Sequence, residues 1–167
     1  MADRQEWRET SLKGRMAESL VYDLLRESGN EIYKIGYEAI LPGLTRIEES
    51  FRRNSNVGEK IRAIPDFFVI DGNKDPHLVE VKFRWSPQWH PDDDERLKRI
   101  RQNWEETIIV HVNCHEKPYF RICYPPFKEI SGSLAQVSAF NISQELLDKF
   151  DVLVEKYLKP TLHKQII

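Results

Sequence analysis

The sequence predicts a single-domain protein of the mixed α/β class, and three observations support this prediction. The chain of 167 residues is long enough to bury one substantial core and short for two. Its composition, 40% hydrophobic and 31% charged, is that of an ordinary globular protein. Helical and strand-like hydrophobic patterns alternate along it. We expect one domain over residues 1–167, with a core at about 12–124 and a C-terminal helix at about 142–158.

The first predicted element is an amphipathic helix from Leu12 to Ser28, and "SGN" ends it. "EIYKIGYEAIL" then predicts a strand, which stops at Pro42. The polar segment from Pro42 to Lys60 predicts a long excursion from the core. The apolar face of the helix consists of Leu12, Met16, Ala17, Leu20, Val21, Leu24 and Leu25.

Two β-favourable runs, Ile64–Ile70 and Leu78–Trp85, come next and are separated by the turn-forming residues "DGNKDP". They predict a hairpin. If the turn is centred in "DGNKDP", residues whose numbers sum to about 146 face one another. This register places Asp66 opposite Glu80.

The second half of the chain predicts a helix, two strands and a last helix. The acidic residues at 92–95 favour a helix start, and "RLKRIRQNW" continues it. "TIIVHVN" and "YFRICY" predict strands, whereas "FKEISGSLAQVSAF" reads as irregular. The last amphipathic helix, Gln144–Leu158, has Asn141 and Gln144 in a capping-box-like arrangement. It either closes the core or forms a dimer contact.

Several functional classes are disfavoured by the bulk properties. No run approaches the roughly 18 apolar residues of a membrane span, and the N-terminus lacks the apolar segment of a signal peptide. We therefore expect a cytoplasmic protein without membrane contact. Its two cysteines fit a reducing compartment. Because the net charge is -2, any binding to nucleic acid must come from a local basic patch.

Asp66 interrupts an apolar run, where a half-buried carboxylate needs a compensating charge, hydrogen bond or metal. Strand alternation places Glu80 and Lys82 on one face. With the Val81 carbonyl, Asp66 and Glu80 form an oxygen-lined site suited to Mg²⁺ or Mn²⁺. Lys82 is placed to orient or deprotonate a water and to neutralise charge on a phosphoryl oxygen. These groups together suit phosphodiester hydrolysis.

A further carboxylate comes from the first helix. Glu18 lies at the edge of its apolar arc, and Gly14, one turn earlier, leaves open space in front of it. An acid in this position reaches a site at the margin of the core.

Three short motifs resemble the PD-(D/E)-x-K nuclease superfamily, which includes restriction endonucleases and archaeal Holliday junction resolvases. They are "GRMAE" on the first helix, "PD" at Pro65 and Asp66, and "EVK" at residues 80–82. The resemblance covers roughly residues 13–84, under half of the chain. It implies a restriction-endonuclease-like αβββαβ core and Mg²⁺-dependent cleavage of DNA. It also implies Asp66 and Glu80 as metal ligands, Lys82 as the catalytic lysine and Glu18 as the helix-borne acid near the metal.

Each of these residues also has a purely structural interpretation. Glu80 and Lys82 are compatible with a solvated strand face, Asp66 with a turn or cap after Pro65, and Glu18 with a surface helix. Trp85 and Trp89 either stack on bases or pack a loop against the core. Phosphate contacts are predicted for a basic set that equally suits a solvated surface, namely Arg84, Arg96, Lys98, Arg99 and Arg101.

The cluster "HVNCH" suggests zinc, but strand alternation separates His111 and His115 from Cys114, so a reduced, metal-free state is expected. The function predicted from the sequence is a metal-dependent endonuclease acting on DNA. A homodimer suits cleavage of two strands, and the last helix is the first candidate for its contact. One alternative is a catalytically silent module of the same fold that binds nucleic acid or protein. Another is a Holliday junction resolvase, which requires a broad basic surface.

Overall fold

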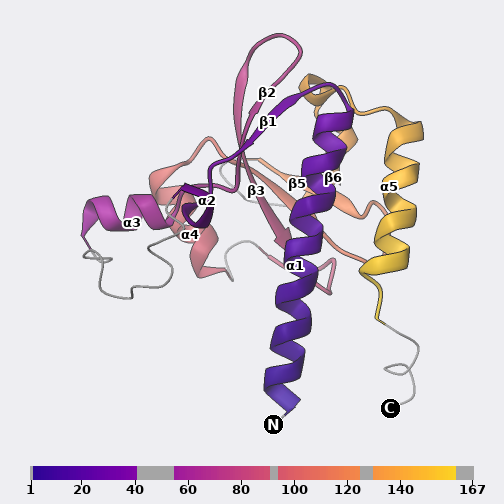
Figure 1. The fold of residues 1–167 in the computed structure, drawn as a ribbon, viewed down its shortest axis with the longest axis horizontal. Coiled ribbons are helices and arrows are strands. Elements are labelled where there is room, and N and C mark those ends of the chain that lie inside the picture. Colours follow the sequence, from indigo (N-terminus) through magenta and orange to yellow (C-terminus); the bar gives the residue numbers. More distant parts are fainter. Residues whose placement is uncertain (1, 41–54, 91–93, 125–129, 161–167) are drawn as a thin grey trace.

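The central element of the fold is an open mixed sheet, seen in a computed structural model that describes residues 2–40, 55–90, 94–124 and 130–160 (Figure 1). Within these residues the sheet has six strands in the order β1-β2-β3-β4-β5-β6. The β3–β4 pair is parallel, and the other neighbouring strands are antiparallel. This confirms the α/β class. The strands are β1 Glu31–Lys34, β2 Phe67–Ile70, β3 Pro76–Phe83, β4 Ile108–Val112, β5 Phe120–Cys123 and β6 Ser131–Ser133.

Helices cover both faces of the sheet and bury two apolar clusters. The helices are α1 Ala2–Glu27, α2 Tyr37–Ile40, α3 Asn56–Arg62, α4 Glu95–Asn103 and α5 Gln144–Tyr157, with 3₁₀ turns at Leu134–Gln136 and Ser138–Phe140. The larger cluster joins α1 and α5 to alternate residues of the strands. The smaller one joins α4 to the opposite face through Leu97, Ile100 and Ile109. α1 and α5 therefore lie on one side of the sheet, and α3 and α4 on the other (Figure 1).

The β2–β3 hairpin has the register that the sequence predicted. Phe67 pairs with Val79 and Ile70 with Pro76, so that each pair of residue numbers sums to 146. Asp71 holds the turn, because its Oδ1 accepts the backbone N–H groups of Asn73 and Asp75 at 2.8 and 3.0 Å. Asp66, one residue before β2, is therefore aligned with Glu80 on β3.

Two strand predictions were wrong. The strand predicted from "EIYKIGYEAIL" ends at Lys34, and Tyr37–Ile40 forms a helical turn instead. The cause is a contact distant in sequence: the N–H groups of Ile35 and Gly36 both donate to the carbonyl of Asp66 and turn the chain away from the sheet. The segment predicted to be irregular contains β6, which pairs with β5. Helix α3, Asn56–Arg62, begins within the predicted excursion and extends two residues past its end at Lys60, whereas residues 42–54 of the excursion lie outside the described part.

The helix predictions need smaller corrections. α1 starts ten residues before Leu12, whose side chain is half exposed. The cap of α5 is Ser143, whose hydroxyl accepts the Leu146 N–H, while Asn141 ends a 3₁₀ turn with a positive φ of 52°. For α4, Asp94 is the N-cap, as the acidic run suggested. No helix of the described residues is long and apolar enough to cross a membrane.

α5 closes the core, and a buried lysine joins it to α1. Lys13 is 8% exposed, and its Nζ donates to three carbonyls at the end of α5. These are the carbonyls of Tyr157, Leu158 and Lys159, at 2.8, 3.0 and 3.1 Å. Because the last carbonyls of a helix have no partner within it, an ammonium group satisfies both their hydrogen bonding and the helix dipole.

Replacing Lys13 by Met is expected to lower the free energy of unfolding by about 2–3 kcal/mol, because the apolar stem is kept while three carbonyls lose their donor. Urea denaturation measures the change. Lys149→Met is the matched control, since Lys149 is exposed on α5 and its pair with Glu145 contributes less than about 0.5 kcal/mol. Equal effects of the two substitutions would contradict this role for Lys13.

His111 lies on the α4 side of β4 in an unusually apolar position. It is fully buried, its ring centroid is 5.1 Å from that of Trp89, and neither ring nitrogen has a hydrogen-bond partner among the described residues. Burial, with the positive charges of Arg121 and Arg84, lowers the pKa of His111 to about 4. The ring is therefore neutral at physiological pH.

This burial predicts an acid-sensitive contribution to stability. His111 is protonated in the unfolded chain below pH 6.5 but in the folded protein only near pH 4. Stability therefore falls as pH decreases from 6.5 to 4, by about 3 kcal/mol at most from this group. Thermal unfolding of His111→Phe between pH 4 and 7 is expected to lack this part of the pH dependence. If the difference in melting temperature between the wild type and His111→Phe stays the same from pH 4 to 7, this contribution of His111 is excluded.

Candidate active site

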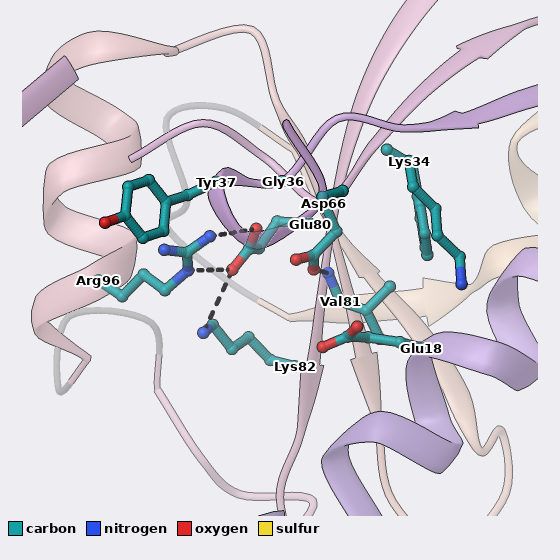
Figure 2. Close-up of a pocket in the computed structure, with 11 residues that line it drawn as sticks. Glu18, Lys34, Gly36, Tyr37, Asp66, Glu80, Val81, Lys82 and Arg96 are labelled. Carbon is teal, nitrogen blue, oxygen red and sulfur yellow. Dashed lines mark hydrogen bonds and ion pairs between the residues drawn. The ribbon is translucent and has the colours of Figure 1, made fainter. Parts of the chain in front are cut away.

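The site predicted from the sequence lies in a cavity of about 530 Å³ between the end of β1, the start of β2 and the middle of β3 (Figure 2). The predicted catalytic residues all line it, although α1, β3 and the loop before β2 contribute them separately. They are Glu18, Asp66, Glu80 and Lys82, together with Val81. The fold therefore brings the predicted acidic residues and lysine to one place.

Asp66 is fixed through both its backbone and its side chain. Its carbonyl accepts the N–H groups of Ile35 and Gly36 at 3.0 and 3.2 Å. Its Oδ2 accepts the N–H of Val81 at 2.8 Å. Since the N–H and C=O of one strand residue face the same edge of the strand, the Val81 carbonyl also faces the side on which Asp66 lies.

The electrostatic environment of Asp66 disfavours its negative charge. Burial raises the pKa of this carboxyl well above its ordinary value, and the charges of Glu80 and Glu18 raise it further. The Val81 N–H and the charge of Arg96 act in the opposite direction. In Figure 2, the Asp66 carboxylate lies between those of Glu80 and Glu18. A cation bound beside Asp66 would favour the charged form of this carboxyl.

Glu80 is the most deeply buried of these acids, at 1% exposed, and two cations hold it. Arg96 Nε lies 2.6 Å from Oε1 and Lys82 Nζ lies 3.2 Å from the same oxygen. Arg96 Nη2 donates to Oε2 at 3.3 Å. Because a carboxylate oxygen has two lone pairs, these contacts occupy both on Oε1 and one on Oε2. Oε2 is therefore the oxygen with capacity for a further ligand.

Arg96, in the first turn of α4, joins four parts of the structure. Besides Glu80, its guanidinium donates to the carbonyls of Arg62 and Ile64 at 2.9 and 3.1 Å. Although burial opposes the charged form, the charge and hydrogen bonds of Glu80 raise the pKa of Arg96 above its ordinary value. Arg96 is thus a permanent internal cation that fixes the orientation of Glu80.

A divalent cation fits the donor set at Asp66. The donors are the Asp66 carboxylate, Glu80 Oε2 and the Val81 carbonyl, all of them oxygen. Within the described ranges no three His, Cys, Asp or Glu side chains form a metal-binding group. Mg²⁺ is usually bound through one or two carboxylates with water and substrate phosphates rather than by a closed protein cage, so the two carboxylates here could hold it. The raised pKa of Asp66 supports this fit, because a bound cation supplies the missing positive charge.

Glu18 reaches the cavity from α1, as predicted. A Cβ at Gly14 would meet nothing within 4 Å, so the space in front of Glu18 is open. Lys34 lines the other side of the cavity, where its Nζ lies 5.3 Å from the ring centroid of Tyr22. It was not predicted, because the end of β1 was placed too late in the sequence.

Four of the five predicted phosphate-contacting residues pair with different carboxylates. Arg84 pairs with Asp94 and lies over the Trp89 ring, and Lys98 is exposed and pairs with Glu95. Arg96 pairs with Glu80, and Arg99 lies near Glu59. Arg101 has a buried Nε. Binding of nucleic acid through the whole set remains a prediction.

The aromatic and cysteine-containing motifs are integrated into the core. The indole N–H of Trp85 donates to Thr10, and its ring packs against Phe83, in agreement with the structural interpretation. Trp89 packs against the smaller cluster. Cys114 belongs to the larger cluster, whereas His111 contacts Trp89 on the other face of the sheet.

Lys34 and Tyr37 line the cavity but had no signal in the sequence as site residues. Tyr37 lies there because β1 ends early. Arg62, whose carbonyl accepts a hydrogen bond from Arg96, is the last residue of a helix that was not predicted. No protein-family model, curated protein or solved structure matches this chain.

Proposed function

We propose that the protein is a Mg²⁺- or Mn²⁺-dependent nuclease that hydrolyses phosphodiester bonds in DNA. The observation that carries this proposal is the convergence of Asp66, Glu80 and Lys82 on one cavity, with Asp66 short of positive charge. The element order α1, β1, β2, β3, α4, β4 also agrees with a restriction-endonuclease-like αβββαβ core, although α2 and α3 interrupt it. Residues of all three motifs that resemble the PD-(D/E)-x-K superfamily line this cavity, which supports the proposal.

Each residue has a distinct role in the proposed reaction. Asp66, Glu80 and the Val81 carbonyl hold the cation, which when bound supplies Lewis-acid activation of the phosphate and of water. Lys82 is held 3.2 Å from Glu80, where its ammonium can stabilise the charge that grows on a phosphoryl oxygen. Glu18 adds a carboxylate at the margin, suited to orient a water near the cation. Arg96 is a positioning residue that acts through Glu80.

The two alternatives differ in turnover and in substrate. A silent binding module of this fold would retain nucleic acid or protein binding without cleavage, and the intact Asp66, Glu80 and Lys82 set favours the enzyme. A Holliday junction resolvase would use the same residues on branched DNA. Because four of the predicted basic residues already pair with carboxylates, they do not favour the broad basic surface that a junction requires.

The proposed function is tested by incubating the protein with supercoiled plasmid, single-stranded DNA and branched DNA, each with Mg²⁺, Mn²⁺ or EDTA. We expect cleavage with either metal and none with EDTA. Lys82→Ala is expected to reduce the rate by about 10²- to 10³-fold, as for loss of one group that stabilises the transition state. Lys149→Ala, on α5, should cleave at the wild-type rate. Absence of metal-dependent cleavage on all three substrates would favour the binding module.

A further inference from the structure

A second cavity, of about 170 Å³, is lined by Tyr37, Arg62, Arg96 and Arg99. We refer to it as the arginine pocket. It adjoins the cavity that contains Asp66, Glu80 and Lys82, which we call the acidic cavity. Tyr37 and Arg96 line both cavities, so the two share a wall. The volume is several times the roughly 30 Å³ that one water occupies in the liquid, which leaves room for a small anionic group.

The charge balance of the arginine pocket favours an anion. Arg62 Nη1 and Arg99 Nε each lie 3.4 Å from an oxygen of the same carboxylate, that of Glu59. One negative charge thus faces two guanidinium groups. Both distances exceed the roughly 2.7–2.9 Å of strong charge-assisted hydrogen bonds, so Glu59 only partly satisfies these donors. Among the described residues, the two ion pairs leave an excess of one positive charge at the pocket.

The third arginine has a different role. Arg96 is held by Glu80 and by the carbonyls of Arg62 and Ile64, so its charge is already balanced. It forms the fixed wall between the cavities rather than a mobile donor. Arg62 and Arg99 are partly exposed, with side chains 26% and 39% accessible, and remain available to a ligand.

Ordered elements hold the two available arginines in place. Arg62 is the last residue of α3 and Arg99 lies in α4. Ala63, directly after α3, packs with Leu97 and Ile100 of α4 in the smaller cluster. The pair is therefore preorganised, which reduces the entropy lost when a ligand binds. Planar guanidinium groups presented in this way match the oxygens of a phosphate.

We propose that the arginine pocket binds a phosphate group, through Arg62 and Arg99, next to the site of Asp66, Glu80 and Lys82. That this phosphate belongs to a nucleic acid rests on the proposed function, and it would then be one that flanks the phosphodiester at the acidic cavity. The phosphate-binding chemistry itself depends only on the pocket. Phosphate binding in this pocket would give Arg62 a role and would distinguish Arg99 from the other basic residues of α4.

The proposal is tested by NMR of the ¹⁵N-labelled protein, following the arginine Nε–Hε signals in EDTA without any divalent metal. Inorganic phosphate and thymidine 3′,5′-bisphosphate are the two probes, and acetate at equal ionic strength is the anion control. We expect saturable shifts of the Arg62 and Arg99 signals with both phosphate probes. Tighter binding of the bisphosphate would indicate a nucleotide, and equal binding a free phosphate ion.

Variants assign the binding to individual residues. Arg62→Ala and Arg99→Ala are each expected to raise the dissociation constant by about tenfold, and Arg99→Lys by less, because it keeps the charge but not the planar fork. Arg26→Ala, which removes an exposed arginine from the end of α1, should bind as the wild type. Shifts that do not saturate, that acetate reproduces, or that persist in both alanine variants would overturn the proposal.

The outcomes separate this proposal from the proposed function. Saturable phosphate binding by a protein that cleaves no DNA would support the arginine pocket and count against the nuclease. Metal-dependent cleavage, together with phosphate binding that Arg62→Ala and Arg99→Ala leave unchanged, would support the nuclease and count against the arginine pocket.

Discussion

Asp66→Asn is expected to abolish metal-dependent cleavage, with a loss of about 10³-fold or more, and at the same time to stabilise the metal-free protein. The Asn amide oxygen can still accept the Val81 N–H, so the local structure is kept. The substitution removes a carboxyl whose charge burial, Glu80 and Glu18 all disfavour. We expect a gain of roughly 1–2 kcal/mol in the free energy of unfolding at pH 7.

The pH dependence of this gain has a defined sign. The folded protein keeps the Asp66 proton at pH values above 3.8, where the unfolded chain has already lost it. The stability of the metal-free wild type therefore falls as pH rises above that value, until Asp66 ionises in the folded state as well. Urea denaturation of both proteins in EDTA from pH 3.5 to 8 should give a difference that grows with pH. Asp23→Asn, at an exposed residue of α1, is the control and should show no such growth.

An Asp66→Asn protein that is less stable than the wild type across this range would contradict the assignment. It would mean that Asp66 is a satisfied structural residue. Retained metal-dependent cleavage would exclude its role as a ligand.

Arg96→Ala is expected to give the largest loss of stability, about 3 kcal/mol or more. Removing one partner of a buried ion pair leaves the other charge uncompensated, and Glu80 would keep only Lys82. The carbonyls of Arg62 and Ile64 lose their donor as well. Urea denaturation at pH 7 measures the change.

A double-mutant cycle isolates the pair. Glu80→Gln combined with Arg96→Ala should be less destabilised than the sum of the single variants. Because a cation near Glu80 replaces part of the missing charge, Mn²⁺ should raise the melting temperature of Arg96→Ala more than that of the wild type. Additive effects, together with equal shifts by Mn²⁺, would show that Arg96 does not act through Glu80.

Local patterns were sufficient to predict much of the fold. The hydrophobic period identified α1, α5 and the strands of the hairpin, and the turn residues at 71–75 fixed its register, because a hairpin turn sets the pairing of both strands. The end of β1 and the existence of β6 depended on contacts distant in sequence. Ile35 and Gly36 turn away because they bond to Asp66, and Ser131–Ser133 forms a strand because β5 offers an edge. Neither contact has a signature in the local sequence.

The site residues were likewise predictable where they depended on local patterns and not where they depended on contacts distant in sequence. The alignment of Asp66 with Glu80 came from the hairpin register, and the placement of Lys82 beside Glu80 came from strand alternation. The pairing of Arg96 with Glu80 was not predictable, since it depends on how α4 packs across the sheet. For the same reason, residues 62 and 99 gave no sign in the sequence that they would line one pocket. The sequence predicted the helix at this position but not what lies opposite it.

We propose that Asp66 and Glu80 together hold one divalent cation beside Lys82. Crystals of the protein soaked in Mn²⁺ test this, because manganese is located by its anomalous scattering. We predict a single peak within coordination distance of Asp66, Glu80 Oε2 and the Val81 carbonyl, and no peak in crystals of Asp66→Asn. A fully soaked crystal with no peak at Asp66, or with the same peak in Asp66→Asn, would show that Asp66 is not a metal ligand.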